Sequence, residues 1–102
     1  MSNAIKMTNH YTDPVFVNEC IFEGMINPTE IDTIESTADV ALRKFADSEL
    51  EIYVSGISSM LIACVRACLK YNIDVTFYHY DKATNSYRPQ KLTGNYAVVD
   101  KV

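Results

Sequence analysis

The chain has 102 residues, 48% of them hydrophobic, which is enough for one packed domain and argues against intrinsic disorder. Its net charge of −4 and isoelectric point of about 5.0 exclude general binding to duplex DNA or RNA, which requires a basic surface. The net negative charge is still compatible with binding of one small anionic ligand, because a helix N-terminus and a few cations can hold a phosphate locally.

We expect residues 1–13 to form a flexible N-terminal segment and residues 14–102 to form a single α/β domain. The leading Ser2-Asn3-Ala4 resembles a cloning scar, so residues 1–4 are given no part in the predicted fold. The first residues lack the apolar core of a signal peptide, and no apolar run of about 18 residues follows. We therefore expect neither a membrane span nor membrane binding.

The three cysteines are an odd number without framework spacing, which indicates a reducing compartment and therefore a cytoplasmic location. Cys64 and Cys68 are four residues apart in a predicted helix, and core packing is the default for such thiols. A zinc site would need two more ligands nearby, and the chain has two histidines. We expect no metal and no cofactor.

Residues 14–22 alternate and are rich in Val, Phe and Ile, which predicts the first strand. Asn27-Pro28-Thr29-Glu30 is typical of a helix start, with Asn27 as the cap and Glu30 completing a capping box. An amphipathic helix is expected to follow as far as Phe45.

Residues 50–54 predict a second strand, and residues 60–71 a second helix that is apolar on most sides. The apolar side chains of such a helix must be buried on most sides, and a subunit interface can bury them. We therefore expect a homodimer or higher homo-oligomer. Residues 73–80 and 87–92 predict two further strands joined by a loop, and residues 96–99 a short fifth one. Pro89 places its strand at a sheet edge.

The predicted fold class is α/β: a small, partly parallel β-α-β-α-β sheet with two helices and an added C-terminal antiparallel hairpin. Whether the helices cover one face of the sheet or both is left open.

The turn at residues 55–59 is the first candidate site. Gly56 permits close approach of a ligand, and Ser58 or Ser59 can cap the helix whose free N–H groups attract anions. Ligands of open α/β sheets bind at this edge. The alternative is an ordinary strand-to-helix turn with a serine cap, since neither a P-loop nor a dinucleotide fingerprint is present.

A second candidate lies at the end of the third strand, where His79 can transfer protons and Tyr80 can stack on bases. Arg88 is a candidate phosphate ligand on the edge strand, or a charge that discourages aggregation. Aromatic residues here also suit cross-strand packing. The segment around His10 has no assigned role.

Residues 52–90 contain a strand ending in Tyr53-Val54-Ser55-Gly56, a serine-rich turn, an apolar helix, and a strand that enters a hairpin. This pattern resembles the small Rossmann-like proteins of CRISPR and other antiviral systems and of phages, including CRISPR-associated Rossmann-fold domains and ring nucleases. The resemblance implies a homodimer that binds cyclic oligoadenylates across its axis and, in ring nucleases, cleaves them by attack of the ligand's own 2′-hydroxyl.

The same resemblance implies that Ser55, Gly56, Ser58 and Ser59 line the ligand and that His79 assists, although the turn lacks a basic residue. The expected function is therefore binding of a nucleotide or cyclic oligonucleotide in antiviral defence or phage counter-defence, with ring nuclease-like phosphodiesterase activity left open. The alternative is a phage or bacterial protein-interaction module without ligand or catalysis. A small enzyme that uses His79 with a tyrosine is a third hypothesis.

Overall fold

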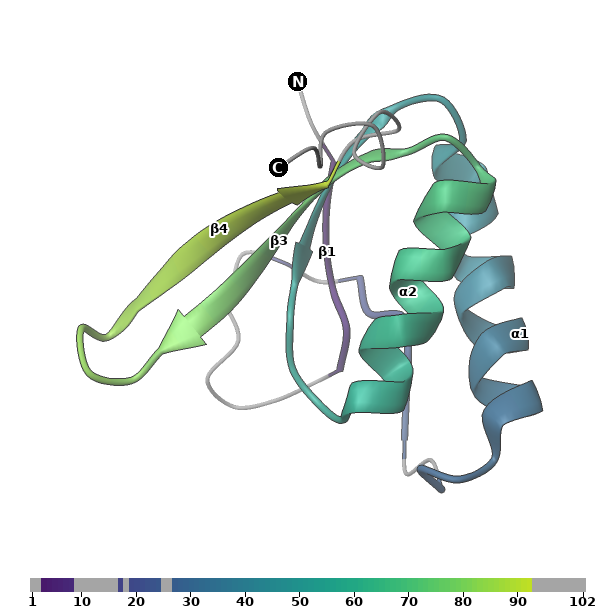
Figure 1. Ribbon diagram of the computed structural model, residues 1–102, viewed down its shortest axis with the longest axis horizontal. Helices are drawn as coiled ribbons and strands as arrows, with labels where there is room; N and C mark the ends of the chain where they lie inside the picture. The colour runs from purple at the N-terminus through teal and green to yellow at the C-terminus, as the bar shows by residue number, and fades with distance from the viewer. Residues whose placement is uncertain (1–2, 9–16, 18, 25–26, 93–102) are drawn as a thin grey trace, which may run out of the picture.

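The computed structural model of the chain describes residues 3–8, 17, 19–24 and 27–92. The predicted fifth strand at 96–99 and the segment around His10 lie outside them. The elements, in chain order, are β1 (Asn3–Lys6), α1 (Ile31–Leu42) with a 3-10 turn (Arg43–Phe45), β2 (Glu49–Tyr53), α2 (Ser58–Lys70), β3 (Asp74–Asp81) and β4 (Ser86–Leu92) (Figure 1).

The strands form one mixed sheet in the order β1-β2-β3-β4. β1, β2 and β3 are parallel, and β4 runs antiparallel to β3, which confirms the predicted α/β class and the edge position of Pro89. Both helices lie side by side on the same face of the sheet (Figure 1). Two right-handed crossovers that advance in the same direction along a sheet place their helices on the same face. The helices therefore cover one face of the sheet and not both.

The first strand is not where the sequence predicted it. β1 is formed by Asn3–Lys6, where Ile5 pairs with Ile52 of β2, and Ile5 and Met7 are completely buried. Residues 19–22 instead run beside the outer edge of β1, where Ile21 N donates to Lys6 O at 3.0 Å. Residues 14–16 and 18 lie outside the described part of the chain. The sheet contacts of Ile5 are non-local, so a local pattern does not reveal them.

The start of α1 also differs from the prediction. Asn27 Oδ1 accepts hydrogen bonds from both the backbone N and the Oγ1 of Thr29, at 3.0 and 2.9 Å, and so closes a turn of its own. The helix then begins at Ile31, with Glu30 as an N-cap that makes no side-chain cap bond. Asn27 therefore stabilises the approach to the helix and does not cap it.

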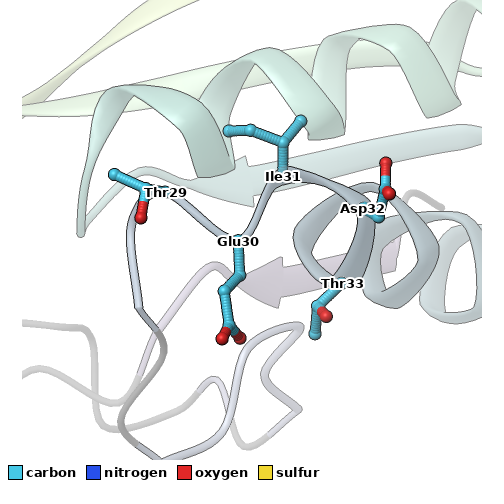
Figure 2. Close-up of a pocket in the computed structure, with 5 residues that line it drawn as sticks. All are labelled: Thr29, Glu30, Ile31, Asp32 and Thr33. Carbon is cyan, nitrogen blue, oxygen red and sulfur yellow. The ribbon is translucent and has the colours of Figure 1, made fainter.

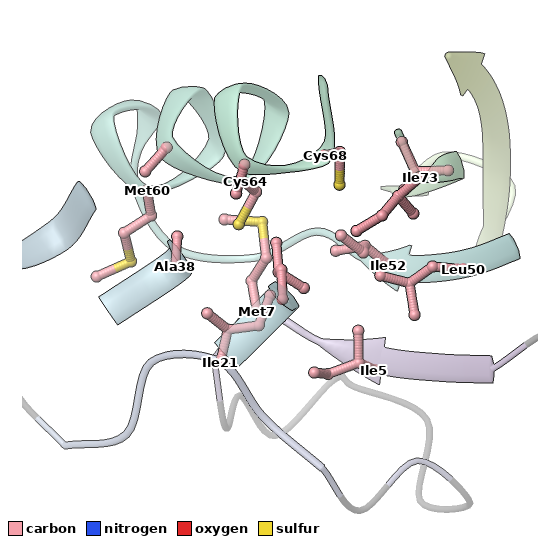
Figure 3. Close-up of a cluster of buried hydrophobic side chains, with 14 of the residues drawn as sticks. Ile5, Met7, Ile21, Ala38, Leu50, Ile52, Met60, Cys64, Cys68 and Ile73 are labelled. Atoms are coloured by element: carbon pink, nitrogen blue, oxygen red, sulfur yellow. The ribbon is translucent and has the colours of Figure 1, made fainter. Parts of the chain in front are cut away.

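The core lies between the sheet and the two helices (Figure 3). β2 and β3 bury every second side chain here, so Leu50, Ile52, Val75 and Phe77 face the helices. Cys64 and Cys68 are buried in the same cluster, and burial raises the pKa of the Cys68 thiol to about 12. Neither described helix is long and apolar enough to cross a membrane.

The β3–β4 hairpin extends away from the helices (Figure 1). Val54 N donates to Tyr78 O at 2.9 Å, so the backbone groups of Tyr78 face β2. Pro89, the register partner of Tyr78, therefore points its nitrogen away from β3, and the missing N–H costs no ladder bond.

Candidate functional site

The carboxyl ends of β1 and β2 meet at one edge of the sheet, where the turn at 55–59 begins. Thr8, just after β1, places its Oγ1 2.6 Å from Ser55 Oγ, and Thr8 N donates to the same oxygen at 3.2 Å. The hydroxyl of Ser55 is thus used to join the two strand ends.

Gly56 has a φ of +92°, a conformation that favours glycine. A Cβ at this position would lie 3.1 Å from Met60 Sδ and 3.1 Å from Thr8 Cγ2. The close approach that the sequence suggested for a ligand is therefore made by two side chains of the protein itself.

The serines after Gly56 do not cap α2. The N-cap is Ile57, with no side-chain cap bond, and Met60 N and Leu61 N donate to its carbonyl. Ser59 Oγ instead donates to Pro28 O at 3.1 Å, while Ser58 is exposed at the first helical position. The predicted cap is corrected because Ile57 is extended and packs on the core, which starts the helix at Ser58.

A pocket of about 360 Å³ lies at the N-terminus of α1, lined by Thr29, Glu30, Ile31, Asp32 and Thr33 (Figure 2). Two of its five lining residues are acidic. Their charge opposes the attraction of the helix N-terminus for anions, so this pocket is unsuited to a phosphate.

His79 lies on the helix-side face of the hairpin, on the same side as Phe77. Its Nε2 is 2.8 Å from Gln90 Oε1, and its register partner Arg88 lies 3.5 Å from Asp81 Oδ2. No hydrogen bond between described residues joins His79 to the turn at 55–59. Tyr80 points to the opposite face from both His79 and Arg88, so the predicted site residues divide into separate groups.

Four tyrosines gather on the sheet face that the helices leave uncovered, here called the tyrosine face: Tyr53, Tyr78, Tyr80 and Tyr87. The rings of Tyr53 and Tyr78 stack at 5.1 Å, Tyr53 meets Tyr87 edge-on at 5.0 Å, and Tyr87 meets Tyr80 at 5.4 Å. Tyr80 is 38% exposed and its phenol donates to Asn85 Oδ1. Burial, with smaller contributions from Glu51 and Tyr78, raises the pKa of Tyr53.

Sequence reasoning found the tyrosines of the hairpin but missed Tyr53, which joins them from a neighbouring parallel strand. The sheet register identifies the neighbours of Tyr53, which pairs with Tyr78 of β3 on one side and with Lys6 of β1 on the other. On the other side, Lys91 pairs with Thr76. Two lysines therefore flank the tyrosine face, and Glu51 shares it.

Charge is distributed unevenly along the chain. Residues 1–53 contain ten acidic and three basic side chains, whereas residues 54–92 contain two acidic and five basic ones. The half that forms α2 and the hairpin is therefore basic within an acidic protein. No group of three or more His, Cys, Asp or Glu side chains among the described residues is arranged to hold a metal ion.

No protein-family model, curated protein or solved structure matches this chain.

Proposed function

We propose that this protein binds a nucleotide or a short single-stranded or cyclic oligonucleotide, and that the tyrosine face is where the bases stack. The observation that carries the proposal is the continuous series of ring contacts from Tyr78 through Tyr53 and Tyr87 to Tyr80 on the sheet face opposite the helices. Stacking of one base on an aromatic side chain is worth about 1–3 kcal/mol and tolerates any base.

The charges around this face favour a ligand with few phosphates. Lys6 and the exposed Lys91 lie at its two sides, and Glu51, two residues before Tyr53, lies on the same face. The cations can meet phosphates, whereas the carboxylate opposes a high density of negative charge. A mononucleotide or small ring held mainly by stacking fits this balance better than a long strand.

The turn at 55–59 adjoins the tyrosine face, since Tyr53 precedes Ser55 by two residues. With the hydroxyls of Ser55 and Ser59 engaged by Thr8 and Pro28, the turn offers a ligand chiefly the exposed Ser58 at the start of α2. In this proposal Ser55, Gly56 and Ser59 shape the turn, and Ser58 is the group that reaches a phosphate.

The biological setting follows from the resemblance of residues 52–90 to Rossmann-like proteins of antiviral systems and phages. On that basis the ligand is a cyclic oligonucleotide signal, and the protein acts in prokaryotic defence or phage counter-defence. His79 lies on the helix side of the hairpin, away from the tyrosine face, so this proposal gives it no part in cleavage of that ligand.

The test is titration with cyclic tetra-adenylate, cyclic di-AMP and AMP, followed by calorimetry and thermal unfolding. At about 100 times its dissociation constant, a bound ligand stabilises the fold by roughly 2.7 kcal/mol, which thermal unfolding detects. Loss of binding in Tyr80→Ser, with a smaller loss in Ser58→Ala, supports the tyrosine face as the main contact and Ser58 as a phosphate contact. The opposite pattern moves the ligand to the turn, and no binding of any of the three contradicts the proposal.

A protein-interaction module is the second candidate, favoured by the outer edge of β4, which ends the described sheet. An extended peptide can add to such an edge, although Pro89 removes one donor from its middle. A partner captured from host lysate without nucleotide, and lost when a second proline replaces Lys91, supports this function over ligand binding.

A further inference from the structure

α2 carries apolar side chains on its solvent side. Ile62 is 56% exposed and Leu69 is 54% exposed, while Leu61 and Val65 beside them are half-buried. We call these four residues the α2 ridge. The other apolar side chains of the helix, from Met60 to Cys68, are turned into the core.

The spacing within the α2 ridge matches that of helices that pack against helices. Ile62, Val65 and Leu69 are three and four residues apart, which is the a/d pattern of a coiled-coil seam, and Ser58 continues it toward the N-terminus. Such a seam stays exposed in a monomer and is buried when a second helix lies along it.

The charged border of the ridge is neutralised within the molecule. Arg66 Nε lies 3.3 Å from Glu35 Oε1, and Lys70 Nζ lies 2.6 Å from Asp39 Oδ2. Both pairs join residues 31 positions apart, as does the contact between Ser59 and Pro28. Because this separation is constant, α1 lies parallel to α2, and the acidic side chains of α1 lie next to the cations of α2. On the side that faces α1, two α2 ridges can therefore approach without bringing unpaired like charges together.

On the other side the ridge continues into a cavity of about 130 Å³ lined by Val65, Phe77, Gln90, Lys91 and Leu92. This space can take a side chain from an opposing helix. α2 has 13 residues and is about 20 Å long, so a helix pair with this cavity filled buries less than the roughly 1,600 Å² of a standard interface. A partner that binds to this surface is therefore expected to be held weakly, so that the amount of complex depends on concentration.

We propose that the occupant of the α2 ridge is the α2 ridge of a second copy, in a two-fold symmetric dimer. The self-complementary seam and the neutral border both favour an isologous contact, in which the same patch serves on each subunit. The inference is independent of the proposed ligand.

Sedimentation of the wild-type protein over a range of concentrations, with the fold checked by circular dichroism, tests the interface. Ile62→Glu and Leu69→Glu are expected to weaken the dimer at least tenfold. Val40→Glu on α1 is the matched control, because Val40 is 61% exposed outside the ridge and is expected to leave the dimer unchanged. A wild-type monomer at all concentrations, or equal effects of Val40→Glu and Ile62→Glu, overturns the proposal.

A mixing experiment tests whether the ridge faces itself. Ile62→Glu and Ile62→Lys are each expected to be monomeric, because like charges meet across the two-fold axis. Mixed at equal amounts they are expected to form a heterodimer, since a glutamate on one ridge then faces a lysine on the other. Dimers of either variant alone, or the absence of a heterodimer, place the contact elsewhere and overturn the proposal.

Discussion

The phenol of Tyr71 donates a hydrogen bond of 2.5 Å to Asp39 Oδ1, which ties the end of α2 to the last turn of α1. Lys70 Nζ reaches the other oxygen of the same carboxylate at 2.6 Å. The pKa of Asp39 is lowered, first by the hydrogen bond from Lys70 and then by that from Tyr71. One carboxylate thus links the two helices by charge-assisted bonds.

Asp39→Asn is expected to lower stability at neutral pH and to have less effect in acid. Because the pKa of Asp39 is lower in the folded state than the unfolded value near 3.9, the stabilisation is present above that value and is lost as pH falls through the folded-state pKa. Urea unfolding at pH 7 and pH 3 measures the difference. Asp74→Asn, at an exposed aspartate, is the control, and an Asp39→Asn defect of equal size at both pH values contradicts the prediction.

Gly56→Ala is expected to destabilise the protein more than Gly24→Ala. Both glycines have positive φ, at +92° and +77°, which costs an alanine about 1–2 kcal/mol. A Cβ at Gly56 also meets Met60 and Thr8 at 3.1 Å, whereas one at Gly24 has nothing within 4 Å. The difference in unfolding free energy between the two variants isolates the steric contribution, and equal losses exclude it.

The contact between Thr8 and Ser55 is expected to show coupling in a double-mutant cycle. Ser55→Ala removes the acceptor of Thr8 N, at a cost of about 1–3 kcal/mol for a buried donor and less where water reaches it. Thr8→Val keeps the methyl group next to Gly56 while removing the hydroxyl. A coupling energy near zero in urea unfolding shows that the two hydroxyls do not stabilise each other.

Much of the fold was predictable because its signals are local. The apolar run of α2, the alternation of β3 and the edge position of Pro89 each follow from neighbouring residues, and the predicted boundaries of these elements lie within two residues of the observed ones. β1 has no such signal. Four residues with one core side chain, Ile5, form a strand because they pair with β2, some 47 positions later in the chain.

The candidate site was less predictable for the same reason. The hydroxyls of the turn at 55–59 were expected to face a ligand. Those of Ser55 and Ser59 instead bond to Thr8 and Pro28, which are distant in sequence and are brought close only by the fold. Tyr53 joins the hairpin tyrosines through sheet register, which composition does not encode. His79 and Tyr80 are adjacent in sequence, and the alternation of a strand sends them to opposite faces.

His79→Ala is therefore expected to leave nucleotide affinity within about twofold of wild type, whereas Tyr80→Ser is expected to weaken it about tenfold. A tenfold loss is equivalent to about 1.4 kcal/mol, which is within the range for one lost stacking contact. The reason is that His79 bonds to Gln90 on the helix side, away from the tyrosine face. Calorimetric titration of both variants with the best ligand decides the question. A larger loss in His79→Ala moves the binding surface to the opposite side of the hairpin.

The three cysteines are expected to react with a thiol reagent in two distinct classes. Cys64 and Cys68 are 0% and 1% exposed, and burial raises the pKa of both, most strongly that of Cys64, so neither forms the reactive thiolate at pH 8. Cys20 is only partly buried. Native protein is expected to react at one thiol, identified as Cys20 by mass spectrometry, and urea-unfolded protein at three. Rapid native labelling of Cys64 or Cys68 contradicts a packed contact between α2 and the sheet, because both thiols are reached only when that contact opens.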